Sequence, residues 1–277
     1  MGTAYARLRL MKMSGQTGSD VELEDIRRAM DAIDDDLMGL LERRFAATEQ
    51  VRKIKLKNDA LGGSAFRPAR EAAIMRRLLS RPENLVPPEL LVRLWRSIFS
   101  MSMQNQAKVT IHISKHLNAS MGLRLRIRDY FGIIPVEEYR DEGQALMQVN
   151  TSPGDICIVE TESPWADAFA EGKSGQARVV ASLPFLRDDI IPKLLVFGHS
   201  PSEPTGDDET LIISDGKLPR DFTPAPLWQI KLGSRRVSCL PGVLSEHESP
   251  LVGLIRSNAL LGLKIAGSYP SPFEIKS

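Results

Sequence analysis

The chain has 277 residues, of which 42% are hydrophobic, and a formal net charge of +1 at pH 7. This charge balance argues against a dedicated nucleic-acid or membrane-binding surface. No apolar stretch is long enough to span a bilayer, and Met1–Met13 lacks the continuous apolar segment of a secretory signal. The two cysteines, Cys157 and Cys239, lie in apolar surroundings without a disulfide framework. We therefore expect a cytoplasmic protein with one large domain or two smaller ones.

A long amphipathic helix is predicted after a flexible tail over residues 1–18. Ser19-Asp-Val-Glu22 matches a capping box, and the helix should run to about Asn58, before Gly62-Gly63-Ser64 breaks it. At about 1.5 Å per residue the helix is roughly 60 Å long, and it cannot bury an apolar stripe alone. The stripe has spacings of three and four and comprises Leu23, Ile26, Met30, Ile33, Leu37, Leu40, Ala47, Val51 and Ile54.

Arg44 falls within this stripe, between Leu40 and Ala47. A buried unpaired charge costs on the order of several kcal/mol, so an anionic ligand is a candidate partner for Arg44. Lys55 follows eleven residues later, close to three whole turns, and therefore shares its face. Arg27 lies about 25 Å before Arg44 along the axis and is rotated by about 100°. Either Arg27 is a surface residue, or a second copy of the chain supplies it to a shared site.

Two shorter helices are predicted next. Pro68 is a favourable first-turn residue for a helix that ends near Ser80, and Pro87-Pro88 begins a further helix. The face of this last helix is continued by Ser102 and Gln106 at i+4 steps. The apolar residues of this helix face are Leu91, Leu94, Trp95 and Ile98.

Beyond Lys108 the pattern changes to short β-branched runs alternating with helix-like segments, which predicts an α/β layer. Ser200–Gly206 has the composition of a linker. Strands are predicted at Val109–Ile113, Ile134–Val136, Asp155–Val159, Ala177–Ala181, Leu194–Phe197, Thr210–Ile213 and Leu263–Ala266, and helices at Ser120–Phe131 and Trp165–Ala170. The predicted fold is multidomain: an all-α domain of three helices followed by an α/β region.

Residues 20–106 resemble the all-helical class of chorismate mutase. The motifs that carry the resemblance are Leu23-Glu-Asp-Ile-Arg27-Arg-Ala-Met-Asp-Ala-Ile-Asp34, Leu40-Leu-Glu-Arg-Arg44, Val51-Arg-Lys-Ile-Lys55, Arg67-Pro-Ala-Arg70-Glu71, and Ser102 with Gln106. The resemblance implies a mutase domain over 19–107, which we expect to form an intertwined homodimer. It also implies a Claisen rearrangement of chorismate to prephenate, which requires no nucleophile, general base, metal or cofactor.

The resemblance assigns a role to each polar residue. Arg27 from a partner chain and Arg44 would bind substrate carboxylates, and Lys55 would bridge a carboxylate and the ether oxygen. Gln106 would donate to the ether oxygen, and Glu71 would hold the ring hydroxyl. Ser102 would assist a carboxylate, and Arg70 would support the site near the ring.

One position departs from the family pattern. Many members carry an aspartate three residues before the Arg-Glu pair, where this chain has Arg67. An aspartate there would also cap the helix that begins at Pro68. The change is expected to weaken the contact near the substrate hydroxyl without abolishing activity, because Lys55 and Gln106 are present.

The C-terminal region resembles, more faintly, a truncated prephenate dehydratase domain over 108–205 and an ACT regulatory domain over 206–277. The stretches involved are Pro192–Gly198, Glu203–Ile213 and Leu263–Pro270. Active dehydratases have Thr-Arg-Phe where this chain has Pro192-Lys193-Leu194. We therefore expect a non-catalytic region with a structural or regulatory role, with an aromatic amino acid as a possible effector.

Other functions remain open at this stage. Isochorismate pyruvate lyase uses the same helical scaffold, and a metabolite-sensing protein could keep the pocket without turnover. Taken singly, the site residues also have plain readings: a solvated Arg27, a snorkelling Lys55, and Ser102 and Gln106 as polar residues that fix register. His112 and His116 have metal-ligand spacing, but they straddle the end of a predicted strand and are not expected to share a face.

Overall fold

The computed structural model describes residues 19–57, 64–256 and 262–274, except for the side chains of residues 19–21, 55 and 56. The chain divides into two compact units, Met1–Ile54 and Lys55–Ser277. Each unit is described by itself below. Within the described residues, no helix is both long and apolar enough to cross a membrane.

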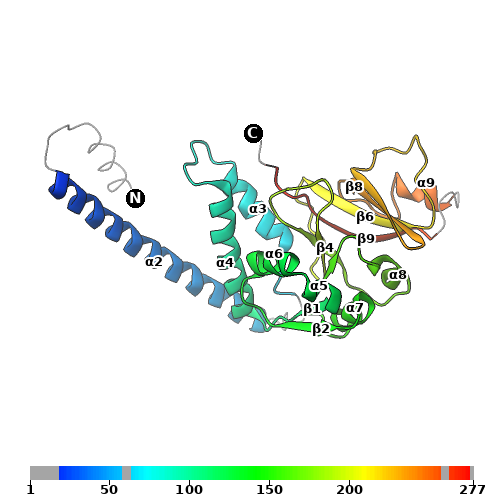
Figure 1. Ribbon diagram of the computed structural model, residues 1–277, viewed down its shortest axis with the longest axis horizontal. Helices are drawn as coiled ribbons and strands as arrows, with labels where there is room; N and C mark the ends of the chain where they lie inside the picture. Colours follow the sequence, from blue (N-terminus) through cyan, green and yellow to red (C-terminus); the bar gives the residue numbers. More distant parts are fainter. Residues whose placement is uncertain (1–18, 58–63, 257–261, 275–277) are drawn as a thin grey trace. The chain divides into compact units, whose positions relative to one another are not determined.

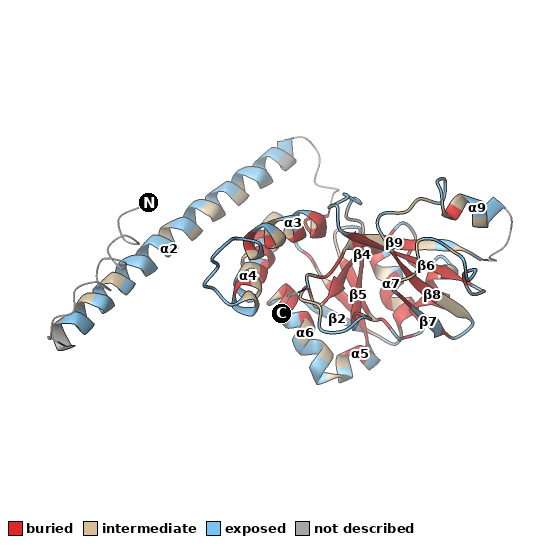
Figure 2. Ribbon diagram, turned by 90° about the horizontal axis from the view of Figure 1, so that it is seen from above, coloured by how far each residue is buried: buried red, intermediate tan, exposed pale blue. Residues whose placement is uncertain are grey.

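The first unit is built on helix α2 (Ser19–Lys57), whose 39 residues confirm the predicted long helix. The capping contact predicted for Ser19 lies outside the described side chains, as does the tail over residues 1–18. The apolar stripe is largely exposed along the helix, as Figure 2 shows by its predominantly pale blue ribbon. The exposed fraction is 58% for Met30, 52% for Leu37 and 58% for Ile54. The described residues of this unit form a single helix, so none of them covers the stripe.

Helices α3 (Pro68–Leu79) and α4 (Pro88–Gln106) open the second unit, and both begin with proline as predicted. Proline suits the first helical position because its missing N–H would have no intrahelical partner there. The two helices pack together, with Leu78 and Met75 of α3 and Phe99 of α4 buried. Their bounds agree with the predicted ones to within one residue.

A five-stranded sheet follows, in the order β2-β1-β3-β5-β4. Its strands are β1 (Ile111–Ser114), β2 (Val136–Tyr139), β3 (Ile156–Glu160), β4 (Arg178–Leu183) and β5 (Leu194–Gly198). The pairings β1–β2 and β1–β3 are parallel, whereas β3–β5 and β4–β5 are antiparallel. Along the chain, the helices that connect these strands are α5 (Lys115–Ala119), α6 (Met121–Phe131), α7 (Glu142–Thr151) and α8 (Trp165–Ala170). The predicted α/β layer is confirmed, although β2 begins at Val136, where the sequence pattern placed its end.

A second, four-stranded antiparallel sheet has the order β7-β8-β6-β9. It consists of β6 (Asp208–Ser214), β7 (Trp228–Leu232), β8 (Arg235–Pro241) and β9 (Lys264–Pro270), with α9 (Leu251–Arg256) beside it. The β7–β8 hairpin was not predicted. The sequence pattern that indicates this hairpin is the alternation of apolar and polar residues in Trp228-Gln-Ile-Lys-Leu232, followed by Gly233. In the structure Gly233 has a φ of 57°, which suits a tight turn.

The hydrophobic core of the second unit is continuous across both predicted boundaries, 107/108 and 205/206. One cluster joins the α3–α4 pair to the first sheet and includes Phe66, Phe99 and Phe131. Another lies between the two sheets and includes Phe197 and Tyr269. Figure 1 shows α4 beside α6 and the first sheet, in keeping with this shared core. The domain boundaries at 107/108 and 205/206 remain predictions.

Candidate active site

Glu71 lies in the first turn of α3, where the positive end of the helix dipole favours a carboxylate. Its side chain is 12% exposed. Its Oε2 atom accepts a hydrogen bond from Nη1 of Arg96 in α4 at 2.7 Å. A charge-assisted bond of this length restrains the carboxylate.

Ser102 and Gln106 occupy the last turns of α4 on one face, as their spacing predicts. Ser102 is buried, and its Oγ donates to the Ile98 carbonyl at 2.7 Å. The Nε2 atom of Gln106 donates to the Ser102 carbonyl at 3.2 Å. Both groups are therefore held along the helix, with the amide of Gln106 half-buried at its end.

Arg27 and Arg44 of α2 belong to the first unit. Arg27 is exposed, and its guanidinium lies 3.8 Å from the carboxylate of Glu24. Arg44 is half-buried on α2. Its backbone carbonyl accepts a hydrogen bond from the Thr48 hydroxyl at 3.1 Å. Lys55 lies in the last turn of α2, with its side chain outside the described ones.

Arg70 and Arg67 differ in their surroundings at the start of α3. Arg70 is exposed. The Arg67 guanidinium forms a hydrogen-bonded ion pair with Glu203 in the segment that leads to β6. The residue at the family's aspartate position is thus engaged with the α/β region.

Arg96 is the main residue that the sequence analysis missed. It is 2% exposed, although a charged residue on an amphipathic helix is usually solvated. Its guanidinium carbon lies 3.6 Å from the Tyr130 ring centroid and 5.1 Å from that of Phe185. Burial raises the pKa of Tyr130 to about 12, and the nearby positive charge of Arg96 partly opposes the rise. No local sequence signal marks Arg96, because the partners that bury it come from other elements.

The two histidines with metal-ligand spacing pair with different carboxylates. His112 on β1 lies 3.1 Å from Asp155, whereas His116 on α5 lies 3.7 Å from Glu160. Among the described residues, no group of three or more His, Cys, Asp or Glu side chains could hold a metal ion. Cys157 is fully buried, and burial raises the pKa of its thiol, as expected for an unreactive cysteine.

Known families were compared with the whole chain. Residues 26–107 match the model of chorismate mutase type II. We refer to this matched part of the chain as the chorismate mutase segment. The match confirms the resemblance for α3, α4 and most of α2, and it contains Arg27, Arg44, Lys55, Arg70, Glu71, Ser102 and Gln106.

A comparison with curated proteins finds no match. Solved structures with similarity include one described as "GqqA- a novel type of quorum quenching acylases", with 11% identity and a TM-score of 0.37. The similar region covers 58% of this chain and 95% of the other chain. Another is a prephenate dehydratase from Streptococcus mutans, with 12% identity, a TM-score of 0.35, and coverage of 61% of this chain and 100% of that one.

Proposed function

We propose that this protein is a chorismate mutase that converts chorismate to prephenate. The observation that carries the proposal is the match of residues 26–107 to chorismate mutase type II. A Claisen rearrangement is intramolecular, so the protein must hold a dicarboxylate in a compact shape and stabilise charge as the ether bond breaks. Cations and amide donors perform both tasks.

The proposed roles follow the family motifs. Lys55 and Gln106 interact with the ether oxygen, where charge develops, and are the catalytic groups together with Arg44 and Glu71. Arg44 also binds a substrate carboxylate, assisted by Ser102. Glu71 accepts a hydrogen bond from the ring hydroxyl, and Arg70 contacts the substrate near the ring. A carboxylate can accept about four hydrogen bonds, so the bond from Arg96 leaves Glu71 able to serve this role.

The proposed assembly is a homodimer in which Arg27 enters the site of the other subunit. Support comes from the exposed apolar stripe of α2, where Ile26 is 48% and Leu37 is 52% exposed. A helix with such a stripe is stabilised when a second apolar surface covers it. A partner chain that covers the stripe brings its own polar residues to the same place.

The proposed setting is the synthesis of phenylalanine and tyrosine in the cytoplasm. Support comes from the reaction product and from two cysteines that are free and buried. The α/β region is proposed to be structural or regulatory, with Pro192, Lys193 and Leu194 in place of a catalytic Thr-Arg-Phe. An aromatic amino acid is its proposed effector.

The test is to follow chorismate loss and prephenate formation by absorbance, using purified full-length protein without added metal or cofactor. Rapid conversion is the expected result. A folded protein that binds chorismate without converting it would favour a sensing role instead. Conversion of isochorismate to pyruvate, with chorismate untouched, would favour the lyase.

A further inference from the structure

The Arg96 guanidinium lies at the junction of the chorismate mutase segment and the α/β region. On one side it donates to Glu71 at 2.7 Å. On the other side it lies over the Tyr130 ring of α6, with Phe185 from the segment after β4 at 5.1 Å. Tyr130 and Phe185 are 8% and 6% exposed. The charge that holds Glu71 is therefore itself held by aromatic side chains of the α/β region.

Two further contacts hold α4 against α6 at the same place. The Ser100 hydroxyl, one turn after Arg96, donates to the Phe131 carbonyl at the end of α6. The next residue is Gly132, where an added Cβ would lie 2.9 Å from Ser100 Oγ. The end of α6 thus lies directly against the Ser100 side chain of α4. Arg96 lies over a ring whose position relative to α4 is tightly defined.

An arginine in this environment has little freedom. Its planar guanidinium donates in a fixed fork, and a desolvated cation is attracted to the faces of aromatic rings. The orientation of Glu71 therefore depends on the rings through Arg96.

We propose that Arg96 is a positioning residue that sets the orientation of Glu71, and that Tyr130 and Phe185 of the α/β region act on the mutase site through it. The proposal rests on the proposed function, in which Glu71 holds the ring hydroxyl of the substrate. It gives the α/β region a defined role in the mutase reaction: the region supplies the aromatic surface that keeps one substrate-binding carboxylate in place.

The experiment measures kcat and KM for chorismate with full-length Arg96→Met, Arg96→Lys, Tyr130→Leu and Tyr130→Phe. Arg96→Met should lower kcat/KM by about 10- to 100-fold, mainly through a higher KM, because misplacing a binding group by about 1 Å has effects of this size. Arg96→Lys should recover part of the loss, since it keeps the charge. Tyr130→Leu should raise KM, whereas Tyr130→Phe keeps the ring and should leave KM near the wild-type value.

The control is Arg93→Met, which removes an exposed arginine one turn earlier in the same helix and should change neither constant. A double variant, Arg96→Met with Tyr130→Leu, should be no worse than Arg96→Met alone, because Tyr130 acts through Arg96. Melting temperatures of all variants identify any that fail to fold. If Arg96→Met does not fold, the Lys, Leu and Phe variants decide the question.

Three results would overturn the proposal. Unchanged kcat and KM in Arg96→Met, with only a lower melting temperature, would show a purely structural role. Fully additive losses in the double variant would show that Tyr130 does not act through Arg96. Wild-type protein without mutase activity would overturn the proposed function and this inference together, whereas the first two results leave the function standing.

Discussion

Arg67, Arg76 and Arg96 each extend from the mutase helices to the α/β region. Arg67 pairs with Glu203. Arg76 donates to the Thr205 hydroxyl at 2.7 Å and to the Ser271 carbonyl at 2.8 Å. An arginine has five donors in a planar fork, so one side chain can satisfy several acceptors on a neighbouring element. These residues resemble ordinary solvated helix charges in the sequence, yet they join two parts of the fold.

At the residue scale, the first prediction concerns Gln106, the group proposed to donate to the ether oxygen. Gln106→Ala should lower kcat by about 100-fold or more, because the lost donor would stabilise charge that develops only in the transition state. Lys55→Ala should have an effect of similar direction and size. Turnover is measured by loss of chorismate absorbance at saturating substrate.

The matched control is Gln104→Ala in the same last turns of α4, where the side chain donates to the Ser100 hydroxyl at 3.2 Å. It should retain wild-type kcat. Equal rates in Gln106→Ala, Lys55→Ala and wild type would remove both residues from the proposed site.

A second prediction at this scale concerns alkaline pH. Burial raises the pKa of Tyr130 from 10.0 to about 12, so the folded protein holds this proton more tightly than the unfolded chain. The resulting stability is fully present below about pH 10 and is lost as the pH rises towards 12. For a shift of two units the loss is on the order of 2–3 kcal/mol.

Chemical denaturation of wild type and Tyr130→Phe at several pH values between 8 and 11 checks this expectation. The variant should lose less stability above about pH 10, because it has no phenol to ionise in the unfolded chain. Parallel pH curves for the two proteins would contradict the assignment.

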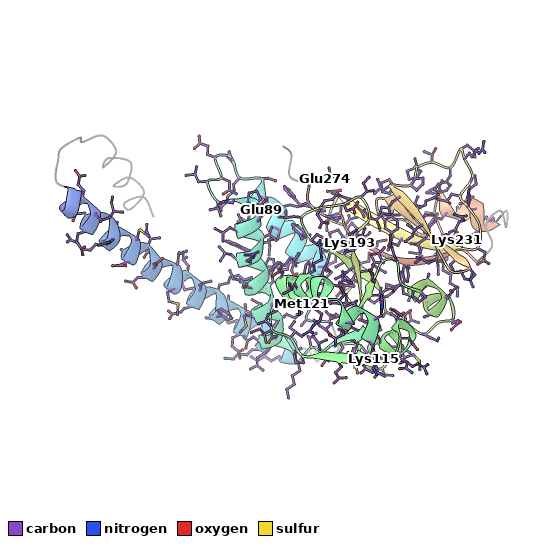
Figure 3. All side chains as sticks on the ribbon, viewed as in Figure 1. Glu89, Lys115, Met121, Lys193, Lys231 and Glu274 are labelled. Carbon is purple, nitrogen blue, oxygen red and sulfur yellow. The ribbon has the colours of Figure 1, made fainter. Side chains whose placement is uncertain are left out.

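At the element scale, the close approach of α4 and α6 holds α4 against the α/β region. Helix α6 begins at Met121, which is labelled in Figure 3, and ends at Phe131, with Gly132 as its C-cap. Gly132 has a φ of 67°, a left-handed conformation that glycine adopts without strain. The same residue gives Ser100 room to reach the Phe131 carbonyl.

Gly132→Ala should therefore destabilise the protein by about 1–3 kcal/mol, through backbone strain and contact with Ser100. The free energy of unfolding from urea titration measures the effect. The control is Gly122→Ala in the same helix, where an added Cβ meets nothing within 4 Å. It should be neutral or slightly stabilising, because alanine is the better helix former. Equal effects of the two substitutions would argue against a tight α4–α6 contact.

At the scale of the whole molecule, the exposed apolar stripe of α2 supports the proposed dimer, because a second chain would cover it. If the proposed dimer shares its sites, Arg27→Ala and Lys55→Ala damage different contributions to the same site. Subunits mixed in equal amounts should regain roughly a quarter of wild-type activity, since half the dimers are mixed and each has one intact site of two.

Each variant incubated alone under the same conditions provides the control and should stay inactive. Unfolding and refolding the two variants together ensures that subunits exchange. A mixture no more active than its components, in a protein shown to be dimeric by light scattering, would mean that Arg27 and Lys55 serve the same site from one chain.

Local signals in the sequence determined the helical segment. Pro68 and Pro88 mark helix starts because proline fits the first helical position, and the apolar spacing of α2 has the period of one helix face. The β-branched runs identified the strands of the first sheet, since they favour a pleated and buried backbone. Motif spacing alone identified the chorismate mutase segment, because one long helix sets the separation of Arg27, Arg44 and Lys55.

The tertiary structure decided which polar residues fix that segment. Glu71 and Arg96 are 25 residues apart and Arg67 and Glu203 are 136 apart, so no periodicity or local motif links them. Burial of Arg96 depends on Tyr130 and Phe185, which only chain folding brings to it. A side chain's charge can be read from its sequence, but its desolvation and its partner are properties of the surroundings that the packed elements create.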